Sequence, residues 1–543
     1  MIPFGHTAAT TFTSSDTRPS LRGKLWAPAA LAEALKTTGR CHCGLNAFRV
    51  VLQPPDPKAT MPFSAEMCHC STCRHTTGQM ATTYLQIKGR PLRMLRETGT
   101  SRSQGPSRTC SPAGSTTSFN SAPAHVERRV AASGQVSTDK LPPMVTIVPP
   151  VETQTPPNPY GITSRGELSD YTEEEYSSSD DSTYTHFSLG FVDDALRSAE
   201  FQDPNAMISL SNLSIYETSP GYKRYSCKEC GAHLFIVDAR GQGNSTSGED
   251  QPKEKWRVGM GSLSDISRFA HIGSHVHVGD TLDGGLADFI RSVNGVTIPR
   301  FSASKGSPEL PIGWRANPND KPTLDFDYMD GQCHCSTMRI RITPPSQEAG
   351  SFKPKAQFPD LIYPVDVTYL SKLANFQDEK WWIRPVEGEE EKYRFIGGSC
   401  MCPFCRLASS MEVQNWVYVP LYNMEYADEK GEWKPLFLDE QSGRRPEGLN
   451  QYTSSPGRYR EFCKKCGATV FYWQMQKHDL ILVSQGLVNE KRGKGVRCEG
   501  LVDWWTRRVS FQEMAIDHSC AKALVDGLEE WAAEEKIVFS LDP

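Results

Sequence analysis

Two matching sets of cysteines limit what this chain can fold into more than any other feature. Each set consists of a C-x-C pair, a C-x-C-x-x-C trio and a C-x-x-C pair, in that order. The first set is Cys41, Cys43, Cys68, Cys70, Cys73, Cys227 and Cys230, and the second is Cys333, Cys335, Cys400, Cys402, Cys405, Cys463 and Cys466. Because the clusters match in order and in internal spacing, the sequence predicts the duplication of one cysteine-rich module.

The residues around the cysteines repeat as well, and the gaps between the clusters locate insertions. The similar pairs are GRCHCGLNAFRV (39–50) with GQCHCSTMRIRI (331–342), and GYKRYSCKECGAHLF (221–235) with GRYREFCKKCGATVF (457–471). Residues 96–185 are rich in Ser, Thr and Pro and include an acidic run. Such a composition buries too little apolar surface to offset chain entropy. It predicts a long disordered insertion in the first module, and the prolines of 301–327 predict a linker.

Length and charge narrow the class of protein. A chain of 543 residues is expected to form two domains, and a net charge of -5 does not favour a nucleic-acid-binding protein. No apolar run is long enough to span a membrane, and residues 1–25 lack the apolar centre of a secretory signal. We interpret this Ser/Thr-rich start as a disordered tail, with a transit peptide as the alternative. Seventeen cysteines without an export signal predict a reducing compartment, either the cytoplasm or the nucleus.

The expected secondary structure is mainly β. Residues with β-branched and aromatic side chains predict strands over 47–52, 82–88, 233–237, 415–422, 469–473 and 480–488. Peripheral helices are expected over 27–38 and over 518–536, the second with Leu524, Leu528 and Trp531 on one face. The predicted order is a tail and short helix (1–37), a first cysteine-rich β domain (38–300), the linker (301–327) and a second such domain (328–535).

Closely spaced thiols in a reducing compartment are metal ligands more often than disulfides. A closed site of four thiolates is structural, whereas three protein ligands leave a position for water or substrate. Seven cysteines in each module divide naturally as four plus three, with the two distant pairs joining both ends of the module. The alternative is that His69 or His233 supplies an eighth ligand and closes the site of the first trio.

These motifs together resemble a known family. CHCSTCRHTTG (68–78), with G-x-C-x-C-G before it and C-x-x-C-G-x-x-L-F after it, is similar to the glutathione-dependent formaldehyde-activating enzymes. That family is also known as the centromere protein V domain family and shares the Mss4-like fold. The resemblance covers both modules, so it implies two tandem Mss4-like zinc-binding β domains.

The resemblance also implies ligand sets and an activity. Up to four zinc ions are implied, with structural sites at Cys41, Cys43, Cys227 and Cys230 and at Cys333, Cys335, Cys463 and Cys466. Open sites are implied at Cys68, Cys70 and Cys73, the expected catalytic group, and at Cys400, Cys402 and Cys405. The implied reaction is carbon–sulfur lyase chemistry on a thiol–aldehyde adduct, such as S-hydroxymethylglutathione, with glutathione or another small thiol as the partner.

Several neighbouring residues have open interpretations. Arg74 and Arg406 follow the last trio cysteine and either contact a substrate carboxylate or ligand sulfur, or are surface charges. His69 is either a general base or a residue that orients its loop, and the loop role is favoured. His271, His275, His277 and Asp280 invite a further metal site, but a strand and turn is the favoured reading. Cys110, Cys498 and Cys520 are expected to be ordinary thiols.

The second trio departs from the first in its sequence. CMCPFCRLASS (400–410) has Met401, Pro403 and Ser410 where the first has His69, Ser71 and Gly78, and Ser336 replaces Gly44. We therefore expect the first module to be the better candidate for catalysis. The competing hypothesis for the whole chain is a non-catalytic, zinc-stabilised module that binds a protein or a nucleic acid. No membrane partner is expected, and the sequence does not predict an oligomeric state.

Overall fold

The computed structural model describes residues 35–55, 62–94, 207–240, 254–319, 327–364, 374–375, 377–389, 391–439 and 442–535. All of them belong to one compact unit, and the structure is mainly β, as expected. We call the described residues up to 319 the first half and those from 327 the second half. The expected N-terminal tail, the insertion at 96–185 and Cys110 lie outside the described residues.

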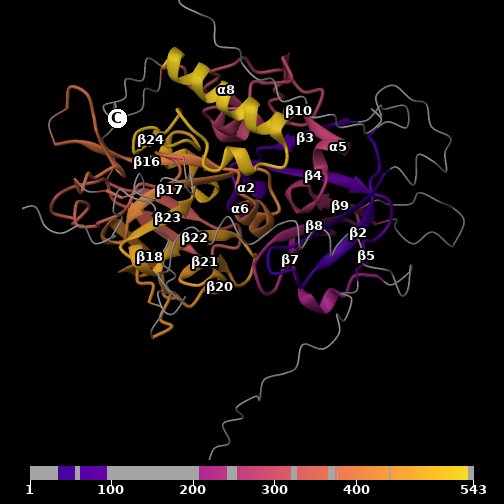
Figure 1. Cartoon of the computed structure of the whole chain (residues 1–543), viewed down its shortest axis with the longest axis horizontal. Helices are drawn as coiled ribbons and strands as arrows, with labels where there is room; N and C mark the ends of the chain where they lie inside the picture. The colour runs from indigo at the N-terminus through magenta and orange to yellow at the C-terminus, as the bar shows by residue number, and fades with distance from the viewer. Residues whose placement is uncertain are drawn as a thin grey trace, which may run out of the picture. The chain divides into compact units, whose positions relative to one another are not determined.

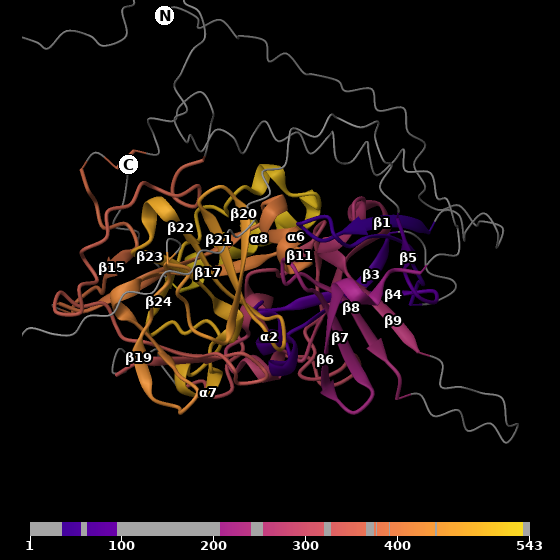
Figure 2. The ribbon, with the colours of Figure 1, turned by 90° about the horizontal axis from the view of Figure 1, so that it is seen from below.

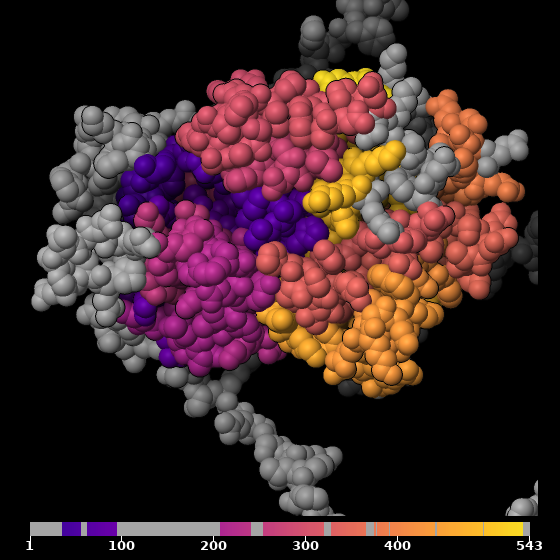
Figure 3. All heavy atoms as spheres, turned by 180° about the vertical axis from the view of Figure 1, so that it is seen from behind, coloured from indigo at the N-terminus to yellow at the C-terminus, as the bar shows by residue number. Residues whose placement is uncertain are grey.

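The main sheet of the first half has seven strands, drawn in indigo and magenta in Figure 1. Their spatial order is β10 (Ala270–Val276), β3 (Phe63–Cys68), β4 (Thr82–Ile87), β9 (Lys255–Gly259), β8 (His233–Asp238), β7 (Tyr222–Cys227) and β6 (Leu213–Ser219). Residues from the indigo segment lie between the magenta and the pink segments in the space-filling view (Figure 3), as this strand order requires.

The main sheet of the second half follows the same plan, in orange and yellow (Figure 2). Its order is β15 (Ile383–Pro385), β16 (Tyr393–Cys400), β17 (Gln414–Pro420), β23 (Leu480–Ser484), β22 (Thr469–Gln474), β21 (Arg458–Cys463) and β20 (Leu449–Ser455). β24 (Val502–Trp504) pairs parallel with β16, as β10 pairs parallel with β3. Six strands in each half therefore share one order, and each half adds a parallel strand at the same place.

Short elements complete both halves. The small-sheet strands are β1 (Lys36–Arg40), β2 (Ala47–Val51), β5 (Leu92–Arg93), β11 (Ser292–Val293), β12 (Val296–Thr297), β13 (Met329–Gln332), β14 (Arg339–Ile342), β18 (Met424–Ala427) and β19 (Trp433–Pro435). The α-helices are α2 (Ser71–Thr77), α5 (Ile266–Phe269), α6 (Pro403–Ser409), α7 (Glu490–Gly493) and α8 (His518–Glu534). The 3-10 turns are η1 (Leu210–Asn212), η2 (Met260–Ser262), η3 (Val278–Thr281), η4 (Gly285–Asp288), η6 (Leu421–Asn423), η7 (Met475–Lys477), η8 (Gln485–Leu487) and η9 (Gln512–Met514).

The expected strands are confirmed over most of their lengths, and one expected helix is wrong in its described part. The strands expected over 415–422 and 480–488 end earlier, at Pro420 and Ser484, where the 3-10 turns η6 and η8 begin. In β2, Phe48 and Val50 point inward while their neighbours are half-exposed, which is the alternation that a half-buried strand requires. The C-terminal helix is confirmed as α8, with Leu524, Leu528 and Trp531 buried. Residues 36–38 of the helix expected at 27–38 lie instead in β1, because this segment pairs with β2. Residues 27–34 are outside the described part.

Two matching backbone contacts join the halves. The amide of Gly486 in η8 donates to the carbonyl of Gly78 at the end of α2 at 3.1 Å, and that of Gly261 in η2 donates to Ser410 at the end of α6 at 2.9 Å. A Cβ at Gly486 would lie 2.2 Å from the carbonyl oxygen of Gln79, and one at Gly261 would lie 2.5 Å from the second-half backbone. Reciprocal contacts of this kind are typical of a two-fold interface.

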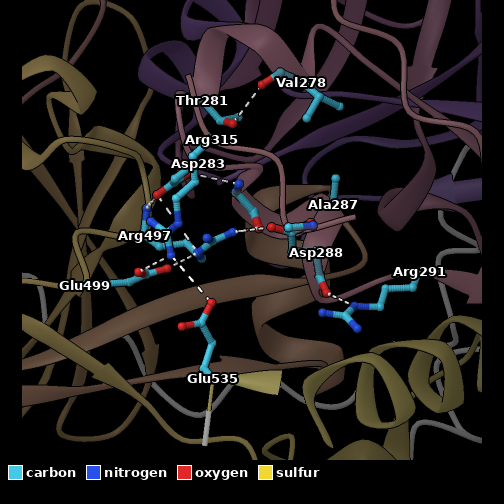
Figure 4. Close-up of polar contacts among 12 residues, drawn as sticks. Val278, Thr281, Asp283, Ala287, Asp288, Arg291, Arg315, Arg497, Glu499 and Glu535 are labelled. Carbon is cyan, nitrogen blue, oxygen red and sulfur yellow. Dashed lines mark hydrogen bonds and ion pairs between the residues drawn. The ribbon is translucent and has the colours of Figure 1, made fainter. Parts of the chain in front are cut away.

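A buried ionic network adds to this junction (Figure 4). Arg497 of the second half lies 2.8 Å from Asp288 of the first half, and its backbone amide donates to Asp283 at 2.7 Å. Arg300 also contacts Asp288 at 2.8 Å, so each buried charge has an opposite partner. Removing one partner from such a network leaves an uncompensated buried charge, which costs far more than a surface ion pair contributes.

Aromatic packing and the expected linker also connect the halves. The ring of Phe289 lies 5.4 Å from that of Trp504 and 5.1 Å from that of Trp531 in α8. Arg315, inside the expected linker, lies 2.6 Å from Glu499. The described part of that linker, 301–319, is therefore held against the second half.

Replacing either interface glycine with alanine should weaken the fold. Gly486→Ala and Gly261→Ala each force the facing backbone to move, and overpacking of this kind costs roughly 1–3 kcal/mol or more. The matched control is Gly89→Ala, because a Cβ there meets nothing within 4 Å. Its cost should be limited to the left-handed backbone, about 1 kcal/mol. Chemical unfolding of the three variants measures the difference, and equal losses would contradict the requirement for close approach.

Candidate functional site

The structure brings the four cysteine groups together as the sequence predicts. The sulfur atoms within each group all lie within 4.8 Å of one another, and no disulfide joins them. The groups are Cys41, Cys43, Cys227 and Cys230; Cys333, Cys335, Cys463 and Cys466; Cys68, Cys70 and Cys73; and Cys400, Cys402 and Cys405. Each group of four joins the start of its half to the turn after β7 or β21.

Local backbone geometry explains why these cysteines converge. The turn after each C-x-C pair contains a residue in the left-handed conformation, Gly44 at φ 73° and Ser336 at φ 58°. The Cys41–Cys43 and Cys333–Cys335 sulfur pairs are both 3.4 Å apart. The C-x-x-C turns end at Gly231 and Gly467, whose amides donate to the carbonyls of Cys227 and Cys463 at 3.0 and 2.9 Å. The replacement of Gly44 by Ser336 therefore keeps the backbone that the cluster needs.

Each trio is placed by a strand end and the first turn of a short helix. Cys68 ends β3, and the Cys70 sulfur caps α2 by accepting from the Cys73 amide at 3.3 Å. The second trio repeats this arrangement, since the Cys402 sulfur accepts from the Cys405 amide at 3.3 Å. A sulfur that accepts a backbone N–H is better suited to be a thiolate than a thiol.

The donor chemistry of all four groups fits a thiophilic metal ion such as zinc. Sulfurs placed tetrahedrally at ~2.3 Å from one ion would lie about 3.8 Å apart. The observed spacing of Cys43 and Cys227 is 3.6 Å, and that of Cys333 and Cys463 is 3.7 Å. Several thiolates this close repel one another strongly unless a cation lies between them. The two groups of four suit a closed site, and the two trios suit a site with one further position.

A buried arginine, which the sequence reasoning missed, contacts each trio. Arg224 of β7 is 2% exposed, and its Nη2 donates to the Cys73 sulfur at 3.1 Å. Arg460 of β21 donates to the Cys405 sulfur at 3.4 Å. Hydrogen bonds from Cys68 and Cys70, together with Arg224, lower the pKa of Cys73 well below its usual range. The repeated arginine three residues before each C-x-x-C pair, in YKRYSC and RYREFC, was the available signal.

The Arg74 and Arg406 side chains, which follow the last cysteine of each trio, are held by contacts within the protein. Both are buried, so neither is a surface charge. Arg74 donates from Nε to the His69 carbonyl at 3.2 Å and pairs with Glu490 of the second half at 3.1 Å. Arg406 donates to the carbonyls of Gly261 and Leu263 in the first half. Each arginine therefore reaches across to the opposite half, Arg74 to a carboxylate and Arg406 to backbone carbonyl groups.

Of the histidines considered from the sequence, His69, His233 and His275 are buried, and His271 and His277 are half-buried. The His69 ring bonds to the His275 ring at 2.9 Å, and His275 bonds to the Ile290 carbonyl at 2.8 Å. This arrangement supports the loop-orienting interpretation of His69. Burial, assisted by Arg224, lowers the pKa of His233 to about 4. Within the described ranges, neither His69, His233 nor the run at 271–280 belongs to a group able to hold a metal ion.

The second trio is enclosed by aromatic side chains. Cys400, Cys402 and Cys405 are all at most 7% exposed, and they share one apolar cluster with Trp416 and Tyr472. Phe404 and Phe511 pack against the same cluster. Little of this trio is therefore in contact with solvent.

The first trio lacks that enclosure. Cys68 and Cys70 are half-buried, and only Cys73 is buried. Thr72 takes the place of Phe404 in the trio motif, and Tyr84 on β4 takes the place of Trp416 on β17. His277 takes the place of Phe511. Each directly follows the residue whose backbone carbonyl accepts a hydrogen bond from an amide of the trio loop. Both also have a left-handed backbone, at φ 57° and 55°. The same backbone therefore carries smaller or more polar side chains around the first trio.

Ser410 shows how one sequence difference is accommodated. It ends α6 at φ 64°, as Gly78 ends α2 at φ 79°. A Cβ at Gly78 would lie 2.1 Å from the Thr469 carbonyl oxygen, so that position requires glycine. The side chain of Ser410 fits because Gly259 faces it, whereas Ser484 lies near Gly78. A glycine on one side of each contact thus compensates for a serine on the other.

The remaining described cysteines lie apart from the four groups. Cys498 and Cys520 are both buried, and burial raises the pKa of both thiols, that of Cys498 to about 12. Within the described ranges neither joins a metal-binding group, so the structure gives them packing roles. None of the described helices is both long and apolar enough to cross a membrane.

Comparison with known families adds one match. Residues 36–146 match the model of the family described as glutathione-dependent formaldehyde-activating enzyme. The matched range contains the first C-x-C pair and the first trio, but neither the first C-x-x-C pair nor the second half. No curated protein and no solved structure matches the chain.

Replacing Arg224 should weaken metal binding by the first trio. The Arg224→Gln variant removes the cation that hydrogen-bonds Cys73, and loss of such a partner typically lowers metal affinity about 10–100-fold. Competition with a chromophoric chelator measures the affinity of each site. Arg257→Gln is the control, because Arg257 lies on the neighbouring part of the sheet and contacts Tyr222, not a cysteine. Unchanged affinity in Arg224→Gln would contradict the assigned role.

Proposed function

We propose that this protein is a zinc-dependent carbon–sulfur lyase that acts on adducts of glutathione or another small thiol with an aldehyde. S-hydroxymethylglutathione is the substrate that the matched family description suggests. The observation that carries the proposal is the first trio, in which two of three converging sulfurs are half-buried rather than enclosed. A site of three thiolates with an accessible side can accept a fourth, exchangeable sulfur.

The reaction makes limited demands on the protein. The carbon–sulfur bond of the adduct breaks with its electron pair passing to sulfur, the hydroxyl proton leaves oxygen, and a carbon–oxygen double bond forms. The products are the aldehyde and a thiolate, which takes up a proton. A zinc ion at the trio would supply the coordination position that stabilises this thiolate and lowers its pKa.

Residues of the chain support that chemistry from the inner side of the trio. Arg224 donates to the Cys73 sulfur and so offsets the negative charge of three thiolates. The Tyr84 side chain lies beside Arg224, and burial raises its pKa, which keeps the phenol neutral. His69 contacts His275, and Arg74 contacts Glu490. We therefore assign His69 and Arg74 the role of positioning the trio loop.

We further infer that the second half arose by duplication and that its trio now has a structural role. The shared strand order and the matched cysteine groups support the duplication. The aromatic enclosure of Cys400, Cys402 and Cys405 supports a closed, non-catalytic site. The competing hypothesis of a zinc-stabilised binding module therefore applies better to the second half than to the first.

Activity should depend on the first trio and not on the second. Cys70→Ser and Cys402→Ser are a matched pair, because both sulfurs cap the trio helix. Cys70→Ser should abolish cleavage of S-hydroxymethylglutathione, followed as release of formaldehyde, while Cys402→Ser should retain it if the variant remains folded. The reverse result would transfer the active site to the second half. Full activity in both variants would reject the trio as the reaction centre.

Zinc content tests the division into four plus three ligands. The four groups predict close to four zinc ions in each wild-type chain. The Cys68→Ser, Cys70→Ser, Cys73→Ser triple variant should contain close to three and remain folded, measured by metal analysis and circular dichroism. About two zinc ions in both proteins would mean that neither trio holds metal, which would favour the binding-module hypothesis.

A further inference from the structure

We propose that the second half completes the substrate site of the first trio, with His334 positioning the bound thiol. The inference rests on the proposed function and extends it, because it assigns a recognition role to the half whose own trio is closed. His334 lies between two cysteines of the second structural group, far in sequence from Cys68, Cys70 and Cys73. Two contacts bring it to them.

The first contact fixes the backbone of His334 to the trio helix. Its amide donates to the carbonyl of His75 at 2.8 Å, and His75 is in α2, two residues after Cys73. The second contact fixes the ring. Nδ1 lies 2.7 Å from the hydroxyl of Tyr216 on β6. Tyr216 pairs directly across the sheet with Arg224, the residue that contacts Cys73.

The second trio shows what space this pair faces. There the pseudo-symmetric contact is between His42 and Tyr452, with the same separation of 2.7 Å. Tyr452 pairs across the sheet with Arg460, as Tyr216 pairs with Arg224. The ring of His42 packs against that of Phe404 with centroids 5.4 Å apart, and Phe404 covers the second trio.

The first trio has Thr72 in place of Phe404. The ring of His334 therefore faces the position that Phe404 fills in the second site, and the smaller Thr72 leaves that position to a ligand. His334 is itself half-buried, and no hydrogen bond from the described residues reaches its Nε2 atom. The histidine–tyrosine pair thus lies beside a phenylalanine in the second site and beside the position of a threonine in the first.

The geometry also indicates what His334 recognises. When the Tyr216 hydroxyl donates to Nδ1, the neutral imidazole carries its proton on Nε2, which then is a donor directed away from Tyr216. Such a donor suits a carbonyl or carboxylate oxygen of the thiol compound, at a distance from the sulfur that binds at the trio. Glutathione offers both kinds of oxygen. His334 is therefore a positioning residue, and it takes no part in breaking the carbon–sulfur bond.

The test uses the full chain with cobalt in place of zinc, titrated with glutathione and followed through the sulfur-to-cobalt absorption. His334→Ala and Tyr216→Phe should each raise the dissociation constant about tenfold, the effect expected for one lost hydrogen bond. His334→Gln, which keeps a side-chain N–H donor, should restore most of the affinity. Thr72→Phe should block binding. In turnover assays His334→Ala should raise KM while kcat stays within about twofold.

The matched controls are the pseudo-symmetric variants His42→Ala and Tyr452→Phe. They perturb the equivalent histidine and tyrosine beside the closed trio and should leave glutathione affinity unchanged. Equal losses in both pairs of variants would show a purely structural contact and overturn the inference, as would unchanged affinity in His334→Ala or no glutathione response in the wild type. Glutathione binding that depends on His334 without any cleavage of the adduct would reject the proposed lyase activity and leave the inference intact.

Discussion

The close approach of backbone to backbone between the halves is the constraint on which the rest of this structure depends. The helices α2 and α6 carry the last cysteine of each trio. The C-terminal end of each helix packs against a turn of the opposite half that contains a glycine. Gly486 and Gly261 allow this approach because they have no side chain. Interiors packed to this density transmit displacement rather than absorb it. A shift at the interface therefore becomes a shift of the trio.

The same interface explains why neither trio can be understood from one half alone. Arg74 reaches Glu490 and Arg406 reaches Gly261, each crossing to the other half. The histidine inside each C-x-C pair also crosses to the other half, where it contacts a strand tyrosine and the short helix that carries the trio. Two-fold interfaces usually join separate chains. Here both sides belong to one chain, and they are free to differ in sequence.

That freedom accounts for the contrast between the two trios. In a symmetric pair of identical chains, both sites would carry the same side chains. A difference such as that between Thr72 and Phe404 could not arise there. Within one chain the second site has Phe404, Phe511 and Trp416 around its trio, while two sulfurs of the first trio are half-buried. At their contact, a glycine on one side faces a serine on the other, Gly78 with Ser484 and Gly259 with Ser410, so the two halves fit each other there.

The sequence by itself determined the cysteine groups, the β class and the C-terminal helix. Cysteine spacing predicts which sulfurs converge because metal sites use short, regular turns. Alternation in strands such as β2 predicts which side chains are buried. Tertiary structure alone decided which side chains reach the trios. Arg224, His334 and Phe404 are distant in sequence, and the strand pairing and interface that gather them follow from packing. For the same reason the contacts of Arg74 do not follow from its neighbour Cys73, because its partner Glu490 lies in the other half.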